Sequence, residues 1–226
     1  HQGIGGVSFV LCNTDAQALR NSPVPVKVQL GAKGEGAGNI PEVAKKLAEE
    51  SAAEVEALFD DNTRMAFITA GMGGGTGTGA APVVARIAKE KGVLTVGIVT
   101  IPFLFEGEPK ILQAFAGVEE MRKHVDALLV INNERLCKIY PDLSWTTAFA
   151  KADDSLSNAA RSIAELVSKD GKINLDFADV RTTLKDGGAA VISTGSGEGE
   201  HRMSRAIQNA LTSPLLKGAE VVLKAE

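Results

Sequence analysis

The residues with the clearest chemistry lie in AGMGGGTGTGAAP (70–82), which holds six glycines within nine positions and no lysine. Backbone N–H groups approach a phosphate closely only where no Cβ intervenes, and a helix N-terminus adds a favourable dipole. We expect a strand over 64–70, a helix over 80–92, and an anion-binding nest of amides between them, with hydroxyl donors from Thr76 and Thr78. Close helix–sheet packing would need only one or two glycines, so the run favours a phosphate-binding loop.

The glycine run alone does not identify which nucleotide the loop would bind. The pattern GxxxxGK[ST] is absent, which argues against an ordinary P-loop NTPase. Gly75 to Ala80 fits the dinucleotide pattern GxGxxA, but that pattern expects an acidic residue at the end of the next strand. The next strand ends in Thr100-Ile101-Pro102 instead.

A second candidate constellation is GKINLDFADV (171–180). Asp176 and Asp179 are three residues apart at an expected helix start, so their carboxylates share one face. They could act on a substrate. They could equally form a capping pair, with Asp176 as N-cap and Asp179 at the third helical position. The spacing alone leaves both interpretations open.

Composition narrows the class of protein. The 226 residues are 44% hydrophobic and 23% charged, with a formal net charge of −4. The Lys and Arg residues do not form the basic stripe that a nucleic-acid groove normally shows, so we expect no nucleic-acid partner. The longest apolar stretch is too short to span a bilayer, so we expect no direct membrane insertion. Cys12 and Cys137 form no CxxC motif and are typical of small buried residues in a reducing compartment, which indicates a cytoplasmic protein.

Apolar runs alternate with amphipathic runs along the chain, which predicts strands alternating with helices. Continuous Val/Ile strands indicate a doubly wound α/β fold with a mostly parallel sheet, which binds ligands at the carboxyl ends of its strands. That edge would hold 13–15, 71–79, 100–102 and 132–133. The expected strands are 6–12, 24–30, 64–70, 93–102, 127–133, 188–194 and 219–225, and the expected helices are 40–61, 80–92, 109–125, 143–169 and 201–211.

GGGTGTGAAP after a strand resembles the signature of the tubulin and FtsZ superfamily of GTPases, and the chain is similar to its FtsZ members over nearly its whole length. The segments that carry the resemblance are NTDAQAL (13–19), GAGNIPE (36–42), AGMGGGTGTGAAPVVA (70–85), VTIPFLFEG (99–107), NNERL (132–136), AFAKADD (148–154) and NLDFADV (174–180).

The resemblance implies three parts. These are a GTP-binding α/β domain over 1–142, a long core helix with its linker over 143–172, and part of a smaller α+β domain over 173–226. The opening HQGIGG is typical of the end of a helix. We therefore expect the family's first strand and its glycine loop to be missing from the chain, together with the rest of the second domain.

The resemblance also implies contacts to GTP or GDP. Gly73, Gly74, Gly75, Thr76, Gly77 and Thr78 would cradle the phosphates, and Ala37 and Gly38 would approach the γ phosphate, although Asn39 stands where many members have alanine. Thr100 and Pro102 would line the sugar side, Glu106 would bind the ribose hydroxyls, and Lys110 would replace an arginine that faces ribose or phosphate. Asn133 and Asp153 would bind the guanine edge, with Phe149 stacked on the base.

Three of these residues have simpler interpretations. Glu106 could be a solvated loop acid, Phe149 could be a core residue because it lies on the apolar stripe of its helix, and Asp153 with Asp154 could be a solvated helix face. The segment Glu108-Pro109 also departs from the run of basic residues that family members often carry after FEG.

By the same resemblance, Asp176 and Asp179, with Asn174, would be catalytic in trans. They would position water against the GTP of the next subunit, with Mg²⁺ accompanying the nucleotide. Head-to-tail contact would complete each site, and an unclosed heterologous interface gives a filament. The implied partner is a second copy of the chain at the division site, and other division proteins and membrane tethers would bind through regions outside it.

Two alternatives remain at this point. The first is a truncated relative that folds but neither binds nucleotide well nor assembles. The second is a dinucleotide-dependent oxidoreductase, which lacks its expected ribose acid here.

Overall fold

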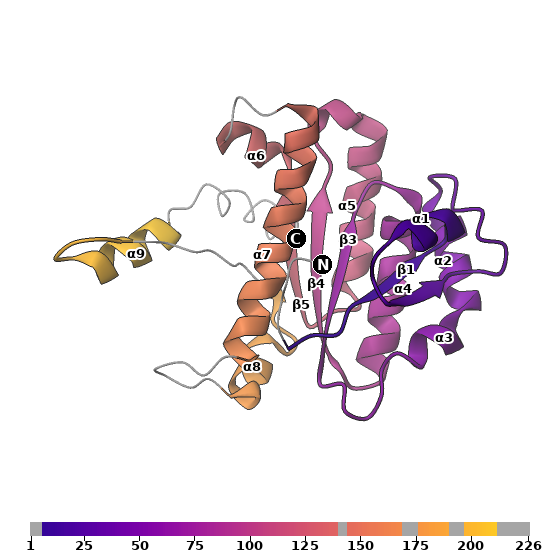
Figure 1. The fold of residues 1–226 in the computed structure, drawn as a ribbon, viewed down its shortest axis with the longest axis horizontal. Coiled ribbons are helices and arrows are strands. Elements are labelled where there is room, and N and C mark those ends of the chain that lie inside the picture. Colours follow the sequence, from indigo (N-terminus) through magenta and orange to yellow (C-terminus); the bar gives the residue numbers. More distant parts are fainter. Residues whose placement is uncertain (1–5, 140–143, 169–175, 190–196, 212–226) are drawn as a thin grey trace.

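The computed structural model describes residues 6–139, 144–168, 176–189 and 197–211 (Figure 1). Its strands form two parallel sheets within these residues. One pairs β1 (Val10–Asn13) with β2 (Val26–Gln29), and the other has the order β3 (Met65–Gly71), β4 (Leu94–Ile101), β5 (Ala127–Asn132) and β6 (Gly188–Ala189). The predicted parallel α/β class is confirmed.

Helices cover both faces of the four-stranded sheet. The side chains of its inner strand β4 point alternately to the two faces and pack against both layers of helices. Val96 and Ile98 pack in one apolar cluster with α7 (Trp145–Ser168). Val99 and Ile101 point to the opposite face and pack in a second cluster with α4 (Gly75–Glu90) and α5 (Glu108–Arg122). This period of two, with seven of the eight β4 residues buried, is typical of a strand covered on both faces.

The central helix of the fold is α4, and it begins at Gly75 rather than at the predicted Ala80. Eleven of its sixteen residues are buried. It packs between the sheet and α5 on one side and α2 (Pro41–Glu50) on the other. Glycine is a poor helix former. Close packing against neighbouring backbones outweighs that propensity here, so the first five helical residues lie inside what the sequence suggested was a loop.

The predicted helix over 40–61 is two helices, α2 and α3 (Ala52–Glu56). Ser51 separates them with ψ of 20°, and its hydroxyl accepts a hydrogen bond from the Gly31 N–H at 2.8 Å. The first strand starts at Val10, four residues later than predicted. The other elements are α1 (Ala16–Asn21), η1 (Leu104–Glu106), α6 (Glu134–Ile139), α8 (Phe177–Leu184) and α9 (Arg202–Leu211).

Two predicted strands remain mostly or wholly undescribed. Only Gly188–Ala189 of the strand over 188–194 lies in the described part, and the strand over 219–225 falls outside it. Among the helices of the described residues, none combines the length and apolar character needed to cross a membrane.

Candidate nucleotide-binding site

The carboxyl ends of β1, β3, β4 and β5 are joined by hydrogen bonds between the segments that follow them. The Met72 N–H donates to the Thr100 carbonyl at 2.9 Å, and the Asn133 N–H donates to the Ile101 carbonyl at 3.2 Å. The hydroxyls of the buried Thr14 and of Thr76 share a hydrogen bond at 2.7 Å. The structure therefore gathers the four predicted ligand segments at one edge of the molecule.

Close backbone approach explains most of the glycines in the run. Gly73 has φ of +97°, and a Cβ there would lie 2.7 Å from Pro102 Cγ and 2.8 Å from the Lys110 carbonyl oxygen. A Cβ at Gly75 would lie 2.8 Å from the Ile40 amide nitrogen. At Gly77 and Gly79 it would overlap the carbonyl oxygens of Gly71 and Pro41. The expectation that packing needs only one or two glycines is therefore wrong, because it accounts for four.

The N-terminus of α4 is nevertheless open toward an anion. Its N-cap is Gly74, no side chain caps it, and the first amides of a helix have no acceptor within the helix. A Cβ at Gly74 would have only Asn39 Oδ1 within 4 Å, at 3.9 Å. Packing does not account for glycine at this position. Gly74 is thus the glycine that best fits a close-approaching ligand.

Two predicted phosphate contacts already have a partner inside the loop. The Gly73 N–H donates to Thr78 Oγ1 at 2.9 Å, and the Thr78 side chain is buried. The donors that this bond leaves for a phosphate belong to the segment from Gly74 to Gly77. Ala37 and Gly38 lie next to this segment, since a Cβ on Gly75 would come within 3.0 Å of Ala37 Cβ.

Gln113 on α5 is a residue that the sequence analysis missed. Its Nε2 donates to the Gly73 carbonyl oxygen at 3.0 Å and to the Asn39 carbonyl oxygen at 3.4 Å. Asn39 has φ of +61°, which is uncommon for a residue other than glycine. Gln113 thus ties the two loops around the α4 N-terminus together. Its place one turn after Lys110, which faces the same site, was the available signal.

Glu106 is held by neighbours rather than solvated, so the interpretation as a solvated loop acid is wrong. Its Oε1 accepts a hydrogen bond from the Phe103 N–H at 3.0 Å, and its Oε2 lies 3.4 Å from Lys110 Nζ. The side chain is 18% exposed. The carboxylate is therefore fixed at the end of η1, beside Lys110, whose backbone carbonyl lies against Gly73.

An aromatic cluster joins η1 to α7. Phe103 is fully buried and stacks on Phe105, with ring centroids 4.8 Å apart, and Phe149 meets Phe103 edge-on at 5.3 Å. Phe103 and Phe105 were not among the predicted site residues. Phe149 is 42% exposed, so the core interpretation of this residue is wrong. A ring supported from one side and open on the other can stack on a planar base.

Asn133 is the most unusual polar group of the site. It is buried, and its Oδ1 has no hydrogen-bond partner within the described residues. A buried unsatisfied oxygen is rare and indicates a missing partner such as a ligand donor. Leu136 next to it packs with Ala148 and Ala152 of α7, which places Asn133 beside the helix that carries Phe149 and Asp153.

Asp153 has an exposed side chain on α7. Its carboxyl pKa is raised above the ordinary value, first by partial loss of solvation and second by the negative charge of Asp154. The exposure agrees with a solvated helix face.

Asp176 and Asp179 form a reciprocal capping box at the start of α8. Asp176 Oδ1 accepts from the Asp179 N–H at 3.0 Å, and Asp179 Oδ2 accepts from the Asp176 N–H at 3.3 Å. The capping interpretation is confirmed, and a catalytic role stays a prediction. Asn174 lies outside the described residues. The described part of the chain holds no group of three His, Cys, Asp or Glu side chains placed to bind a metal ion.

A parallel α/β domain with a glycine-rich helix N-terminus at the carboxyl edge of its strands belongs to the nucleotide-binding class. A comparison with models of protein families assigns the chain to one family within this class. The sequence model of the Tubulin/FtsZ family, GTPase domain, matches residues 3–141, and the chain belongs to this family.

Individual relatives agree with this assignment. The chain is 64% identical to the cell division protein FtsZ of Porphyromonas gingivalis over 98% of its length, and it spans 49% of that relative. It matches the solved Methanocaldococcus jannaschii FtsZ dimer with a TM-score of 0.88 and 46% identity, covering 95% of this chain and 63% of that one. It matches the GDP-bound CetZ1 monomer of Haloferax volcanii with a TM-score of 0.68 and 26% identity, covering 80% and 55%.

Proposed function

We propose that the protein carrying this chain is a polymerising GTPase of bacterial cell division, which binds and hydrolyses GTP between head-to-tail subunits. The observation that carries this proposal is the pairing of two unsatisfied groups at one edge of the sheet. They are the uncapped N-terminus of α4 and the buried Asn133 Oδ1. The first suits phosphates, and the second suits an N–H donor of a base.

The phosphates would be bound by the segment Gly74–Gly77, with Ala37 and Gly38 beside it. An anion there interacts with free amides and with the positive end of a sixteen-residue helix. Gly73 and Thr78 would act indirectly, because their mutual hydrogen bond shapes the loop. Backbone donors of this kind explain how the site could work without a Walker lysine.

The sugar and base would lie along η1 and the start of α7. Thr100 and Pro102 would line the sugar side. Glu106 retains acceptor capacity for ribose hydroxyls beyond its two present partners. The exposed ring of Phe149 would stack on the base. Asp153 and Asn133 supply acceptors for the N–H groups of guanine. Adenine does not present the same N–H donors at that edge.

Hydrolysis would need the acids of a second subunit, because α8 belongs to the opposite edge of the sheet from the glycine loop. Asp176 and Asp179, with Asn174, would orient or deprotonate the attacking water. Mg²⁺ would accompany the nucleotide, where it neutralises phosphate charge. The GDP that accompanies CetZ1 in its solved structure and the FtsZ dimer support nucleotide binding and self-association as the activities to test.

The experiment is a comparison of nucleotides in the full-length protein. GTP and GDP should raise the midpoint of thermal unfolding, and ATP and NAD should not. Addition of GTP with Mg²⁺ should make the protein sediment as polymers and release phosphate. Equal stabilisation by ATP and GTP would contradict the guanine site, and hydrolysis by dispersed monomers would contradict the shared one. Division-site localisation follows from the same proposal and can be tested with a fluorescent fusion.

A further inference from the structure

The helix α8 lies at the edge of the four-stranded sheet where its strands begin (Figure 1). Three residues of this edge come from different elements: Arg64 directly precedes β3, Lys89 lies in the last turn of α4, and Asp126 directly precedes β5. They contact the segment that starts with the Asp176–Asp179 capping box and ends at Gly188.

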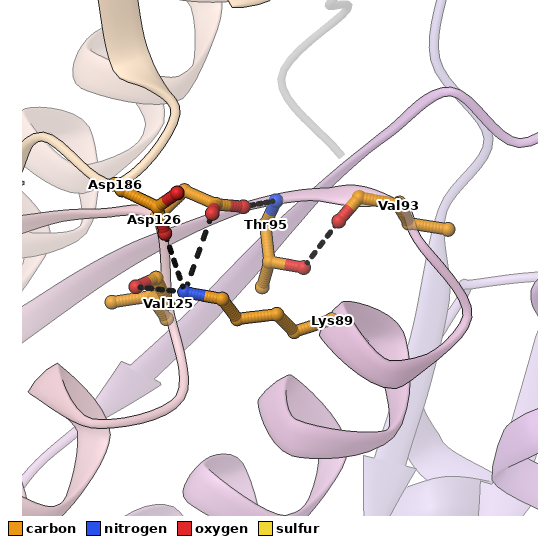
Figure 2. Close-up of polar contacts among 6 residues, drawn as sticks. All are labelled: Lys89, Val93, Thr95, Val125, Asp126 and Asp186. Atoms are coloured by element: carbon orange, nitrogen blue, oxygen red, sulfur yellow. Dashed lines mark hydrogen bonds and ion pairs between the residues drawn. The ribbon is translucent and has the colours of Figure 1, made fainter.

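The end of α8 is fixed through Lys89, as Figure 2 shows. Lys89 Nζ lies 3.3 Å from Asp186 Oδ1, 3.3 Å from Asp126 Oδ1 and 3.2 Å from the Val125 carbonyl oxygen. Asp126 is buried and also accepts from the Thr95 N–H at 2.8 Å. The lysine therefore bridges a buried, hydrogen-bonded carboxylate and the exposed Asp186, which lies two residues after the last residue of α8.

The start of α8 is held by a different cation. The guanidinium carbon of Arg64 lies 4.0 Å from the ring centroid of Phe177, which is the first residue of α8 and follows Asp176 directly. A guanidinium at this distance over an aromatic face is attracted by the ring quadrupole. Arg64 thus contacts the turn that presents the two carboxylates.

Packing alone leaves the direction of α8 weakly determined. The helix has eight residues and one buried residue, Val180, with Leu184 partly buried against the cluster beneath α7. Contacts gathered on one side near the middle and end of a short helix allow it to tilt. Two attachments at its opposite ends remove that freedom, and both are cationic side chains of the nucleotide-binding domain.

We propose that Arg64 and Lys89 are positioning residues for GTP hydrolysis in the neighbouring subunit, because they set the direction of α8 and hence the reach of Asp176 and Asp179. The inference rests on the proposed function, since it needs those carboxylates to act in trans. Displacement of a catalytic group by about 1 Å lowers a rate by roughly 100-fold. A modest tilt of α8 is therefore enough to matter.

The test uses the full-length protein with Arg64→Leu and, separately, Asp186→Gly. Asp186 has φ of +52°, so glycine keeps its backbone conformation, removes the carboxylate that Lys89 holds, and leaves the Lys89–Asp126 pair intact. Each variant should lower kcat of the assembled protein about 10-fold or more, while GTP affinity of the unassembled subunit stays within about 2-fold of the parent. Arg64→Lys should restore part of the rate, because an ammonium over the ring keeps a cation–π attraction although it cannot stack as the planar guanidinium does.

Lys91→Gln is the matched control. Lys91 lies two residues beyond Lys89 and pairs with Glu56 of α3 at 3.3 Å, away from α8. Parent-like kcat in Arg64→Leu and Asp186→Gly would overturn the inference. Equal losses of kcat and GTP affinity, or a similar loss in Lys91→Gln, would also overturn it, because they indicate general destabilisation. A parent protein that does not hydrolyse GTP would instead overturn the proposed function, and the inference with it.

Discussion

Gly74→Asp is a substitution for which the structure predicts opposite effects on stability and on nucleotide binding. Gly74 is the N-cap of α4 with φ of −97° and ψ of 175°, a conformation open to any residue. Its Cβ would meet nothing closer than Asn39 Oδ1 at 3.9 Å. An aspartate there would fit without strain. Its carboxylate would accept hydrogen bonds from the amides that now lack a cap.

The stability effect follows from helix capping. Exchange of a glycine cap for aspartate contributes a few tenths of a kcal/mol, and the charge at the positive end of the helix adds about 0.3–1 kcal/mol. For a chain of this size, a gain of about 1 kcal/mol corresponds to a rise of roughly 2–4 °C in Tm. We therefore expect Gly74→Asp to unfold at a slightly higher temperature than the parent when no nucleotide is present.

The binding effect has the opposite sign because the new carboxylate occupies the proposed phosphate site. Two unit charges about 6 Å apart repel by about 3 kcal/mol at an effective dielectric constant of 20. That energy corresponds to a loss of roughly 100-fold in affinity. Gly74→Ala adds a methyl group without charge and should bind GTP far better than Gly74→Asp.

Thermal unfolding without nucleotide and calorimetric titration with GTP and GDP measure the two effects separately. Gly77→Ala provides a contrast in the same loop, since its Cβ would overlap the Gly71 carbonyl oxygen. It should destabilise the fold by about 1–3 kcal/mol. If Gly74→Asp binds GTP within threefold of the parent, the α4 N-terminus is not the phosphate site and the reasoning fails.

Three further predictions concern titratable groups. Asp179→Asn keeps an oxygen that can accept from the Asp176 N–H, so a phosphate-release assay should show lost turnover while GTP titration shows unchanged binding; lost binding would refute the trans role. Asp153 must be ionised to accept from guanine, so GTP affinity should fall as the pH drops through its raised pKa. Asp154→Asn should move that fall to lower pH, and an unshifted profile would contradict it. Partial burial raises the pKa of the Cys12 thiol to about 11, so mass spectrometry should find it alkylated at pH 8 more slowly than after unfolding; equal rates would contradict the raised pKa.

The sequence predicted the sheet well because its strands are continuous apolar runs of a kind that only a covered parallel sheet accommodates. β4 and β5 end within one residue of the predicted positions, and the Asn133 N–H after β5 bonds to the Ile101 carbonyl at the end of β4, so the two ends meet as expected. The capping box was also predictable, since Asp176 and Asp179 stand at the spacing that such a box requires.

The start of α4 was not predictable from local preference. Glycine at 75, 77 and 79 opposes a helix, and only the backbones packed against those positions explain why the helix forms there. Contacts between elements that lie far apart in the sequence could not be predicted either. The spacing of Gln113 from Lys110 indicates the site that it faces but not the two loops that it joins. Nothing in the spacing of Arg64 or Lys89 indicates that they reach α8, because those partners are set by the fold.

The central claim is that one GTPase site is built from two subunits, and complementation between inactive variants tests it most directly. Gly74→Asp keeps the acids of α8 but should not hold nucleotide, and Asp179→Asn holds nucleotide but lacks the acid. Each full-length variant alone should release almost no phosphate from GTP, while a mixture of the two should regain hydrolysis, because some interfaces pair intact halves. A mixture as inactive as its separate components, with both variants folded, would contradict the claim.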